Sequence, residues 1–317
     1  MRDVFAVAAS WLDEKRSFAL ATLVELREAA TAQLGTTIAV DEHGTVFGNI
    51  GAGCYEADIV EACLKTASDG QTRRLDINLD SEDEILGGTA CGAVMRLVTW
   101  RPRHAFAGEA RAIASGDRAA RLRVEYETPG GTSAAFEHVF APKDRLVLVG
   151  ATAVAAEIVL LANRLDFKVV IVEPRPTYAT RERAPEASEI VRAWPDDCLP
   201  ALLSDTTPIV VLSHDPKFDL PALRCALRSK APYIGLLGSR RSQASRRDSL
   251  RADGFDEAAL ARIHGPVGLD LGGVTVAETA LSILAEIVAS RRGGRGSPLG
   301  NAHGAIHRRL EPIVQKG

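Results

Sequence analysis

The sequence predicts an α/β protein in which an N-terminal α+β domain precedes a Rossmann-like domain with a parallel sheet. Two observations lead to this fold class. From Leu146 onward, short and uninterrupted apolar strands alternate with helices, a pattern typical of a parallel sheet that is covered on both faces. Before that point the expected helices and strands show no such alternation, and the proline-containing segment Ala141–Asp144 forms a candidate linker between the two patterns.

The length of 317 residues also suits two domains. We expect an N-terminal domain over residues 1–141, a C-terminal domain over residues 142–291 and a disordered tail over residues 292–317. The tail is rich in glycine, arginine and histidine and has few large apolar side chains. It therefore cannot bury enough surface to offset the entropy lost on ordering.

Hydrophobic periodicity places the elements of the first half of the chain. Apolar side chains of the first expected helix share one face, and a hairpin turn is expected at residues 41–44. The expected helices are residues 2–14, 55–67 and about 106–115. The expected strands are residues 18–26, 36–40, 45–47, 75–79, 94–100, about 121–126 and about 134–140.

The second half of the chain alternates more regularly. Its expected strands are residues 146–149, 169–172, 209–212 and 233–237. Its expected helices are residues 153–165, 216–229, 241–252 and 276–290. Thr275 and Glu278 have the spacing of a capping box, which predicts the start of the last helix.

Composition and charge exclude several classes of protein. Hydrophobic residues make up 46% of the chain and charged residues 25%, which suits a globular protein with a full core. The 38 lysines and arginines are balanced by 41 acidic residues. No overall positive field therefore draws the chain to nucleic acid or to a membrane surface.

Cysteine use and the N-terminal sequence predict a cytoplasmic protein. The five cysteines are odd in number and include no CxxC pair, which argues against a disulfide framework and a structural zinc site. The first residues lack the pattern of a secretory signal. The most apolar window, residues 146–162, is too short to span a membrane comfortably and contains Glu157.

The first candidate site is the Gly-rich segment Gly48–Glu56, in which a strand is expected to end and a helix to begin near Cys54. The free N–H groups and partial positive charge of a helix N-terminus lower the pKa of a thiol, so we expect Cys54 to be a thiolate. Gly51 and Gly53 would let a ligand approach the backbone. This chemistry suits a soft metal, a sulfur atom in transfer or an anionic pterin phosphate. The alternative is a tight turn with a small buried cysteine.

The other cysteines differ in their surroundings. Cys91 lies in a second Gly-rich segment, Gly87–Gly92, where a functional and a purely structural role are equally compatible with the pattern. Cys63 lies on an apolar helical face and is expected in the core. Cys198 and Cys225 are also expected to have structural roles alone.

The first strand of the second half is followed by a broken dinucleotide fingerprint. Gly150 has the position of the first glycine, and Glu173 lies far enough beyond it to contact a ribose. However, Thr152 replaces the second glycine, which admits the pyrophosphate, and Ala155 takes the third place. The sequence therefore predicts a Rossmann-like fold without NAD(P) binding, and Glu173 is alternatively a solvated residue at a strand end.

His214 and Asp215 follow another predicted strand, at the edge where open α/β sheets bind ligands. Asp215 precedes Pro216 and has the pattern of a helix N-cap, which explains it without a ligand. His214 has no such structural explanation and is the stronger candidate.

Two more loops contain candidate residues. Ser239, Arg240 and Arg241 lie between a predicted strand and a predicted helix, where the arginines could hold a phosphate or carboxylate. The alternative is a serine N-cap with solvated arginines. Asp270 precedes the last helix and could face the same crevice.

Taken together and in this order, these motifs resemble the XdhC/CoxI family of molybdenum-cofactor insertion and maturation chaperones, which serve xanthine dehydrogenase and related hydroxylases. The resemblance covers about residues 1–100 and 145–290. It is carried by Gly51-Ala52-Gly53-Cys54-Tyr55-Glu56, Ala90-Cys91-Gly92, Ser213-His214-Asp215-Pro216, Gly235-Leu236-Leu237-Gly238-Ser239-Arg240-Arg241, Gly268-Leu269-Asp270 and Ala280–Ile287. The chain departs from the family pattern at Ala52 and Ala93, where glycine is common, and at Thr152.

The resemblance implies an accessory protein rather than a catalyst. Such proteins bind the molybdenum cofactor (molybdopterin) and hold it while a cysteine desulfurase supplies the terminal sulfido ligand. They then deliver it to an apo molybdenum hydroxylase of the xanthine dehydrogenase type. Cys54 and Cys91 match the two cysteines of the family's N-terminal domain, and Cys54 is the candidate contact to molybdenum.

The resemblance also implies a set of cofactor-binding residues in both domains. These are Gly51, Gly53, Cys54, Glu56, Cys91, Gly92, His214, Asp215, Ser239, Arg240, Arg241 and Asp270. Two other functions stay open: an NAD(P)-binding oxidoreductase, and a sulfur carrier or redox protein that uses Cys54 and Cys91 as a pair. The oligomeric state is also open, with a homodimer as one option.

Overall fold

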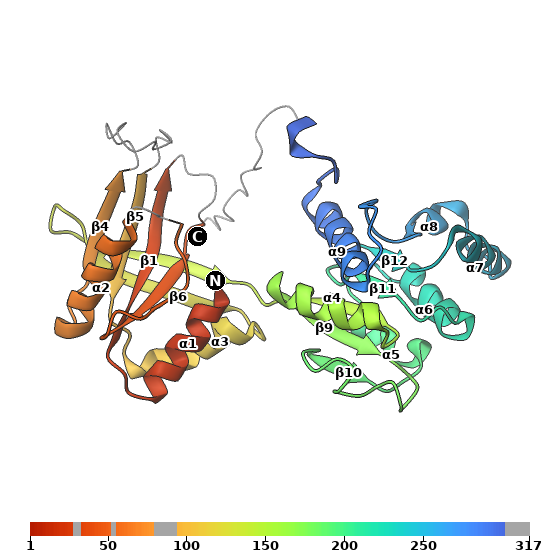
Figure 1. Cartoon of the computed structure of the whole chain (residues 1–317), viewed down its shortest axis with the longest axis horizontal. Helices are drawn as coiled ribbons and strands as arrows, with labels where there is room; N and C mark the ends of the chain where they lie inside the picture. Colours follow the sequence, from red (N-terminus) through yellow and green to blue (C-terminus); the bar gives the residue numbers. More distant parts are fainter. Residues whose placement is uncertain (28–32, 52–54, 79–93, 302–317) are drawn as a thin grey trace. The chain divides into compact units, whose positions relative to one another are not determined.

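A computed structural model gives the fold of the chain and describes residues 1–27, 33–51, 55–78 and 94–301. The chain divides into two compact units, Met1–Pro142 and Lys143–Gly317 (Figure 1). The first unit combines an antiparallel sheet with helices, and the second has a parallel sheet with helices on both faces. The predicted fold class is therefore confirmed.

The N-terminal unit is built on an antiparallel sheet with the strand order β3-β2-β1-β5-β4. Its strands are β1 (Phe18–Arg27), β2 (Thr37–Asp41), β3 (Val46–Phe47), β4 (Arg73–Asn78) and β5 (Val94–Trp100). Its helices are α1 (Arg2–Asp13), α2 (Glu56–Asp69), the short 3-10 helix η3 (His104–Phe106) and α3 (Ala107–Ser115). A separate antiparallel ribbon consists of β6 (Ala120–Glu127) and β7 (Ser133–Phe140).

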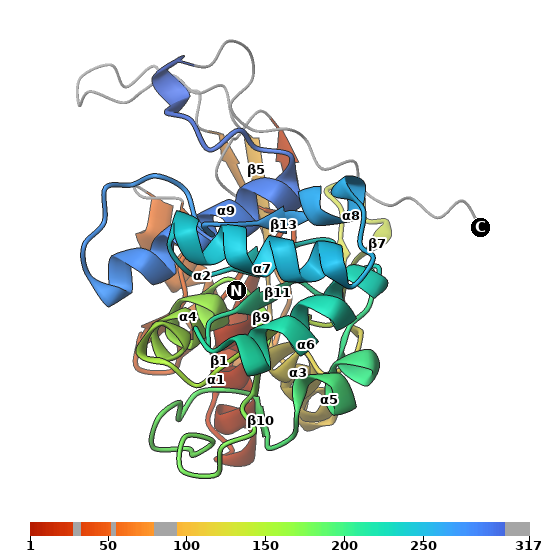
Figure 2. The same ribbon diagram turned by 90° about the vertical axis from the view of Figure 1, so that its right-hand side faces the viewer.

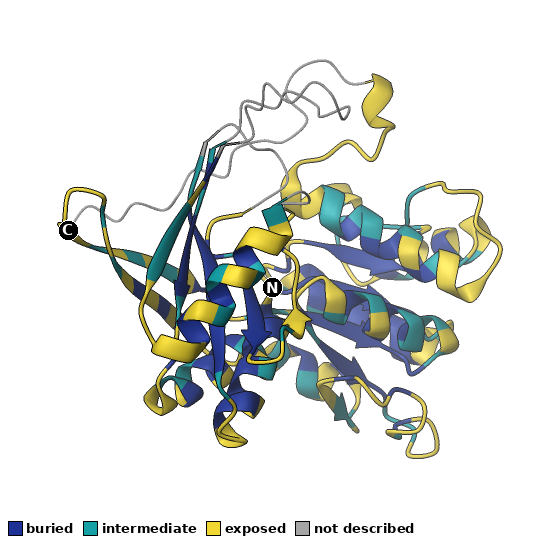
Figure 3. Cartoon of the chain, turned by 60° about the vertical axis from the view of Figure 1, so that its left-hand side comes forward, coloured by how far each residue is buried: buried dark blue, intermediate teal, exposed yellow. Residues whose placement is uncertain are grey.

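Both faces of this sheet are covered. Helix α2 packs on one face, while α1, α3 and the β6-β7 ribbon cover the other. Strand β1 is therefore buried on both sides, as the dark blue strands in Figure 3 show. Cys63 of α2 lies fully inside the first of these cores, which confirms its predicted place.

The C-terminal unit has a parallel sheet with the strand order β10-β9-β8-β11-β12-β13. The strands are β8 (Asp144–Val149), β9 (Phe167–Val172), β10 (Glu189–Val191), β11 (Ile209–Val211), β12 (Ile234–Leu236) and β13 (Ile263–His264). The helices are α4 (Ala153–Arg164), α5 (Pro195–Leu202), α6 (Pro216–Arg228), α7 (Arg240–Ala252), α8 (Glu257–Ala261) and α9 (Val276–Arg292), followed by η4 (Leu299–Asn301). The sequence pattern missed β10, α5, α8 and β13, because such short elements carry little periodicity.

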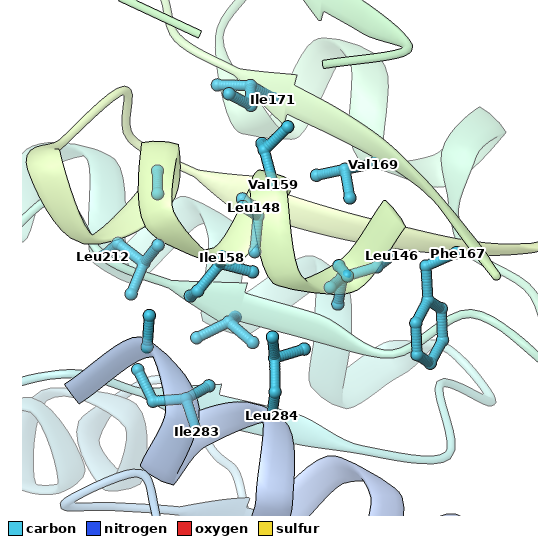
Figure 4. Close-up of a cluster of buried hydrophobic side chains, with 14 of the residues drawn as sticks. Leu146, Leu148, Ile158, Val159, Phe167, Val169, Ile171, Leu212, Ile283 and Leu284 are labelled. Carbon is cyan, nitrogen blue, oxygen red and sulfur yellow. The ribbon is translucent and has the colours of Figure 1, made fainter. Parts of the chain in front are cut away.

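Alternate residues of the central strand β8 enter two different cores. Leu146 and Leu148 face α4 and α9, where Figure 4 shows them against Ile158 and Leu284. Val147 and Val149, which alternate with them, face the core formed with α5, α6, α7 and α8. Figure 2 shows α6 and α7 next to each other on that side of the sheet. A parallel sheet covered on both faces requires this continuous apolar sequence.

Gly48 is required by the close approach of α1 to the end of β3. Its backbone has a φ of +100°, and a Cβ atom there would lie 2.7 Å from Cγ2 of Val4 and 3.2 Å from the carbonyl oxygen of Thr37. Gly51 also has a positive φ, of +74°, but a Cβ atom at that position would meet nothing within 4 Å. Comparing substitutions at these two glycines therefore distinguishes the cost of backbone strain from the cost of steric crowding.

We expect Gly48→Ala to lower the free energy of unfolding by about 2–4 kcal/mol, because backbone strain and overpacking add up. The matched control Gly51→Ala carries the strain alone and is expected to cost about 1 kcal/mol. Urea denaturation of the full chain measures both. Equal losses in the two variants would show that α1 does not press on this loop.

Candidate functional site

The loop at Gly48–Gly51 borders a pocket in the N-terminal unit. The pocket has a volume of about 310 Å³ and is lined by Met1, Val4, Gln33, Thr36, Thr37, Gly48, Asn49, Ile50 and Gly51. Of the predicted cofactor-binding residues, Gly51 lies in its lining. The side-chain oxygen of Asn49 accepts a hydrogen bond of 2.6 Å from the backbone N–H of Gly51 and so fixes the turn.

The predicted residues that follow this loop are described only in part. Helix α2 begins at Glu56, with Tyr55 as its N-cap, and Glu56 is exposed in the first turn. Gly53 and Cys54 lie outside the described residues, as do Cys91 and Gly92.

The described cysteines have poorly ionised thiols. Burial raises the pKa of Cys63 to about 12. Burial also raises the pKa of Cys198 to about 11, and the pKa of Cys225 above its ordinary value. None of these three thiols therefore has the lowered pKa that a reactive cysteine needs.

In the C-terminal sheet, β9 and β10 lie on one side of β8, whereas β11, β12 and β13 lie on the other side. The strand order therefore switches between β8 and β11, and open α/β sheets bind ligands at such a switch point. The loops that follow these two strands touch at that point. Gly150 has a φ of +105°, and a Cβ atom there would lie 2.9 Å from Cα of Ser213. Only glycine lets the two loops approach this closely.

The broken fingerprint has a structural role of its own. Thr152 is the N-cap of α4, and its hydroxyl accepts a hydrogen bond of 3.2 Å from the backbone N–H of Ala155. Glu173 is fully buried, which corrects the interpretation of a solvated residue. Its carboxylate accepts bonds from the backbone N–H groups of Ala151 and Arg175 and two more from the Arg175 guanidinium, at 2.7–3.0 Å.

Glu173 therefore has no free lone pair for a ribose hydroxyl, because a carboxylate accepts about four hydrogen bonds. Burial alone would raise its pKa, but the Arg175 side chain and the two backbone donors outweigh burial and lower the pKa below its ordinary value. The charged carboxylate thus links the loops that follow β8 and β9.

His214 lies in a strained part of the loop after β11. It has a φ of +60°, its side chain is exposed, and it makes no side-chain bond with any described residue. A contact with α7 stabilises this backbone conformation, because Arg246 donates a hydrogen bond of 3.1 Å to the carbonyl oxygen of His214. Non-glycine residues with positive φ persist only where surrounding contacts fix them.

A buried ion pair anchors this loop. Nε of Arg246 donates a hydrogen bond of 2.7 Å to Oδ2 of Asp219, and both side chains are almost completely buried. The hydroxyl of Ser213 donates to the other carboxylate oxygen. The ion pair therefore connects α6, α7 and the loop that presents His214.

Sequence reasoning missed this pair, although a signal existed. Asp219 lies on the same helical stripe as Ala222, Leu223 and Ala226, which are all buried. A charged residue on an apolar stripe indicates a buried partner, since an unpaired buried charge is very costly.

The remaining candidates are caps and exposed side chains. Asp215 caps α6 by accepting a hydrogen bond from the Lys217 backbone, and Ser239 caps α7 by accepting one from the Ser242 backbone. The N-cap roles that the sequence offered as alternatives to ligand binding are therefore confirmed for Asp215 and Ser239. The exposed arginines Arg240 and Arg241 make no bond with any other described residue.

Asp270 is exposed, and its carboxylate accepts a hydrogen bond of 3.3 Å from the backbone N–H of Gly272. The loop that contains Asp270 is anchored by Glu286 of α9, a residue that the sequence did not single out as a site. Glu286 accepts hydrogen bonds from the Tyr233 hydroxyl and the Gly268 backbone and pairs with His264 at 2.8 Å.

Two kinds of feature are absent from the described part of the chain. It contains no helix long and apolar enough to cross a membrane. It also contains no group of three or more histidine, cysteine, aspartate or glutamate side chains arranged to hold a metal ion.

Two family profiles match the chain. The XdhC and CoxI family profile matches residues 11–78, and the XdhC Rossmann domain profile matches residues 146–287. The chain belongs to the XdhC and CoxI family. The two matched regions lie in the two compact units, and the predicted family is thus confirmed.

Two curated relatives of this XdhC and CoxI protein are similar to it over most of their length. A Bacillus subtilis protein, named as a probable subunit of xanthine dehydrogenase, is 23% identical, covering 89% of this chain and 95% of the relative. The molybdenum cofactor insertion chaperone PaoD of Escherichia coli is 26% identical, covering 92% of this chain and 88% of the relative.

A solved structure supports the fold. The crystal structure of a protein from Bacillus halodurans, described as a xanthine dehydrogenase, covers 93% of this chain and 98% of its own, with a TM-score of 0.74. The two sequences are 21% identical, so the similarity establishes the fold alone.

We expect Asp219→Ala to lower the free energy of unfolding by about 3–5 kcal/mol, because it leaves the Arg246 charge buried and unpaired. The matched control is Asp253→Ala, which breaks the partly exposed pair of Asp253 with Arg224 between the same two helices. That loss is expected to be at most about 1 kcal/mol. Urea denaturation distinguishes the two, and similar small losses would mean that the buried pair does not anchor the loop.

We expect calorimetry with NAD and NADP to show no binding tighter than about 1 mM, or about −4 kcal/mol. The physical reasons are the Thr152 side chain at the pyrophosphate position and the saturated carboxylate of Glu173. Thr152→Gly is expected to gain no micromolar affinity, because Glu173 stays occupied. Micromolar binding by the unmodified protein would contradict this and favour the oxidoreductase hypothesis.

Proposed function

We propose that this protein binds the molybdenum cofactor as cargo, supports its sulfuration and inserts it into a hydroxylase of the xanthine dehydrogenase type. The observation that carries the proposal is the match of both compact units to the family, together with the near full-length similarity to a molybdenum cofactor insertion chaperone. In this role the protein is an accessory factor and not a catalyst.

The N-terminal unit supplies the part of the site that holds the reactive end of the cargo. Gly51 lines the pocket, and Gly53 and Cys54 follow it two and three residues later in the chain. A thiolate at Cys54 is a soft ligand that would suit molybdenum or a sulfur atom in transfer. Cys91, Gly92 and Glu56 complete the proposed set in this unit.

The C-terminal unit supplies exposed groups at the carboxyl ends of its strands. Arg240 and Arg241 have no partner among the described residues, so their charges are free to attract a phosphate. His214 offers an imidazole on a strained and firmly held loop. Asp215, Ser239 and Asp270 already bind backbone N–H groups, and we infer that they shape these loops for the cargo.

Three partners belong to the proposal. The first is a cysteine desulfurase that supplies the sulfur, the second is the apo hydroxylase that receives the cofactor, and the third is a second copy in a homodimer. Co-purification of each partner with the tagged protein tests these interactions separately from cofactor delivery.

We expect Cys54→Ala to abolish delivery of sulfurated cofactor without unfolding the protein. The measurement is the molybdenum content and the cyanide-releasable sulfur of a hydroxylase produced together with each variant. The control is Cys198→Ser, which keeps a hydrogen-bond donor for the carbonyl oxygen of Trp194 and is expected to deliver normally. Iodoacetamide is expected to modify Cys54 faster than Cys63 or Cys198 near neutral pH.

Normal delivery by Cys54→Ala would show that this cysteine is only a small residue in a turn. The function itself would be rejected if the hydroxylase acquired as much sulfurated cofactor in the absence of this protein as in its presence. If a sulfur atom accumulates on the protein without any bound cofactor, the sulfur-carrier hypothesis is favoured instead.

A further inference from the structure

We propose that the pocket beside the Gly48–Gly51 loop binds the uncharged pterin ring system of the cargo, and that the phosphate of the cargo is held outside this pocket. The inference rests on the proposed function and adds to it which chemical part of the ligand this site recognises. It is argued from the chemistry of the lining residues, all of which belong to the N-terminal unit.

One wall of the pocket is a turn that is firmly attached to β1. The backbone N–H of Leu23 donates to the carbonyl oxygen of Thr36, and that of Gly35 donates back to Leu23, both at 2.8 Å. The Thr36 N–H closes the turn on the carbonyl oxygen of Gln33 at 3.0 Å. His138 packs on Gly35, where a Cβ atom would lie 2.9 Å from the ring. Gln33 and Thr36 are thus presented from a fixed backbone.

The facing wall is the Gly48–Gly51 loop, and it is equally constrained. Ile50 is buried in the core under α2, and Gly48 is pressed against Val4 of α1. Asn49 between them uses its side-chain oxygen to hold the Gly51 N–H, and this leaves its amide NH₂ group as a donor. A preformed pocket loses little entropy when a ligand binds.

The side chains of the described lining offer hydrogen bonds without charge. No described residue that lines the pocket has a charged side chain. The amide of Gln33, the hydroxyl of Thr36 and the NH₂ group of Asn49 make no hydrogen bond with any other described residue. Val4 and Ile50 supply apolar surface. A pterin is a planar neutral heterocycle with several donors and acceptors at its edge, which such a mixed lining suits.

The size also suits a fused ring pair. A volume of about 310 Å³ lies at the lower limit of small-molecule pockets, which range over about 300–1,000 Å³. The pocket is therefore large enough for one heterocycle but small for the complete cofactor.

The same lining disfavours a phosphate. An anion that leaves water needs a cation or several strong donors, because its desolvation is costly. Met1 brings one positive charge, its α-amino group, to the described lining of the pocket, but Asp3 in the first turn of α1 places a negative charge at the same end of the helix. The nearest arginine in sequence, Arg2, is directed elsewhere and donates to the carbonyl oxygen of Ile113 at 2.7 Å.

The test is a fluorescence titration of the full chain with 6-hydroxymethylpterin, a neutral and fluorescent probe. The protein carries no N-terminal tag, because Met1 lines the pocket. We expect saturable binding that an excess of inorganic phosphate does not reduce. Gln33→Ala is expected to weaken binding about three- to tenfold, as the loss of one hydrogen bond predicts.

Two further variants make the result specific. Asn49→Asp keeps an oxygen acceptor for the Gly51 N–H but replaces the NH₂ donor by a charged oxygen, so it is expected to weaken binding at least as much as Gln33→Ala. Gln71→Ala is the matched control, because Gln71 is an exposed glutamine of the same unit that does not line the pocket. Its affinity is expected to equal that of the unmodified protein.

Absence of saturable pterin binding, competition by inorganic phosphate, or unchanged affinity in Gln33→Ala and Asn49→Asp would each overturn the proposal. These outcomes differ from a failure of the proposed function. A protein that delivers the molybdenum cofactor but does not bind the pterin probe refutes the pocket assignment alone. A protein that binds the probe but delivers no cofactor refutes the function alone.

Discussion

The central strands of both sheets are buried on both faces, and this burial confines the groups that can meet a ligand to the loops at the strand ends. Strand β1 lies between α2 and the layer of α1 and α3, and β8 lies between two sets of helices. A buried side chain on either strand therefore has to be apolar or fully bonded. The chemistry of the protein is consequently carried by glycine-rich turns and helix starts.

These loops are held in place by polar contacts that are buried or half-buried and that reach across the fold. Glu173 connects the ends of β8 and β9, the Asp219–Arg246 pair fixes the loop after β11, and Glu286 anchors the loop that follows β13. Each carboxylate accepts several hydrogen bonds, and for the fully buried Glu173 and Asp219 the removal of a partner would leave a buried charge. The arrangement explains how His214 can keep a strained backbone while its side chain stays exposed.

The two units present different chemical surfaces. The described side chains that line the pocket of the N-terminal unit are uncharged, whereas Arg240 and Arg241 at the start of α7 in the C-terminal unit have no partner among the described residues. Under the proposed function, the first kind of surface suits a neutral heterocycle and the second suits a phosphate.

The sequence by itself determined the fold class, the core position of Cys63 and the capping roles of Asp215 and Ser239, because periodicity and local capping depend on neighbours in the chain. It also indicated the family through motifs whose order is visible in the sequence. Only the tertiary structure decided that Glu173 is buried and saturated, that Arg246 reaches Asp219 from another helix, and that Gln33 and Asn49 line one pocket. These facts join residues far apart in the chain, and packing against distant elements sets them rather than any local preference.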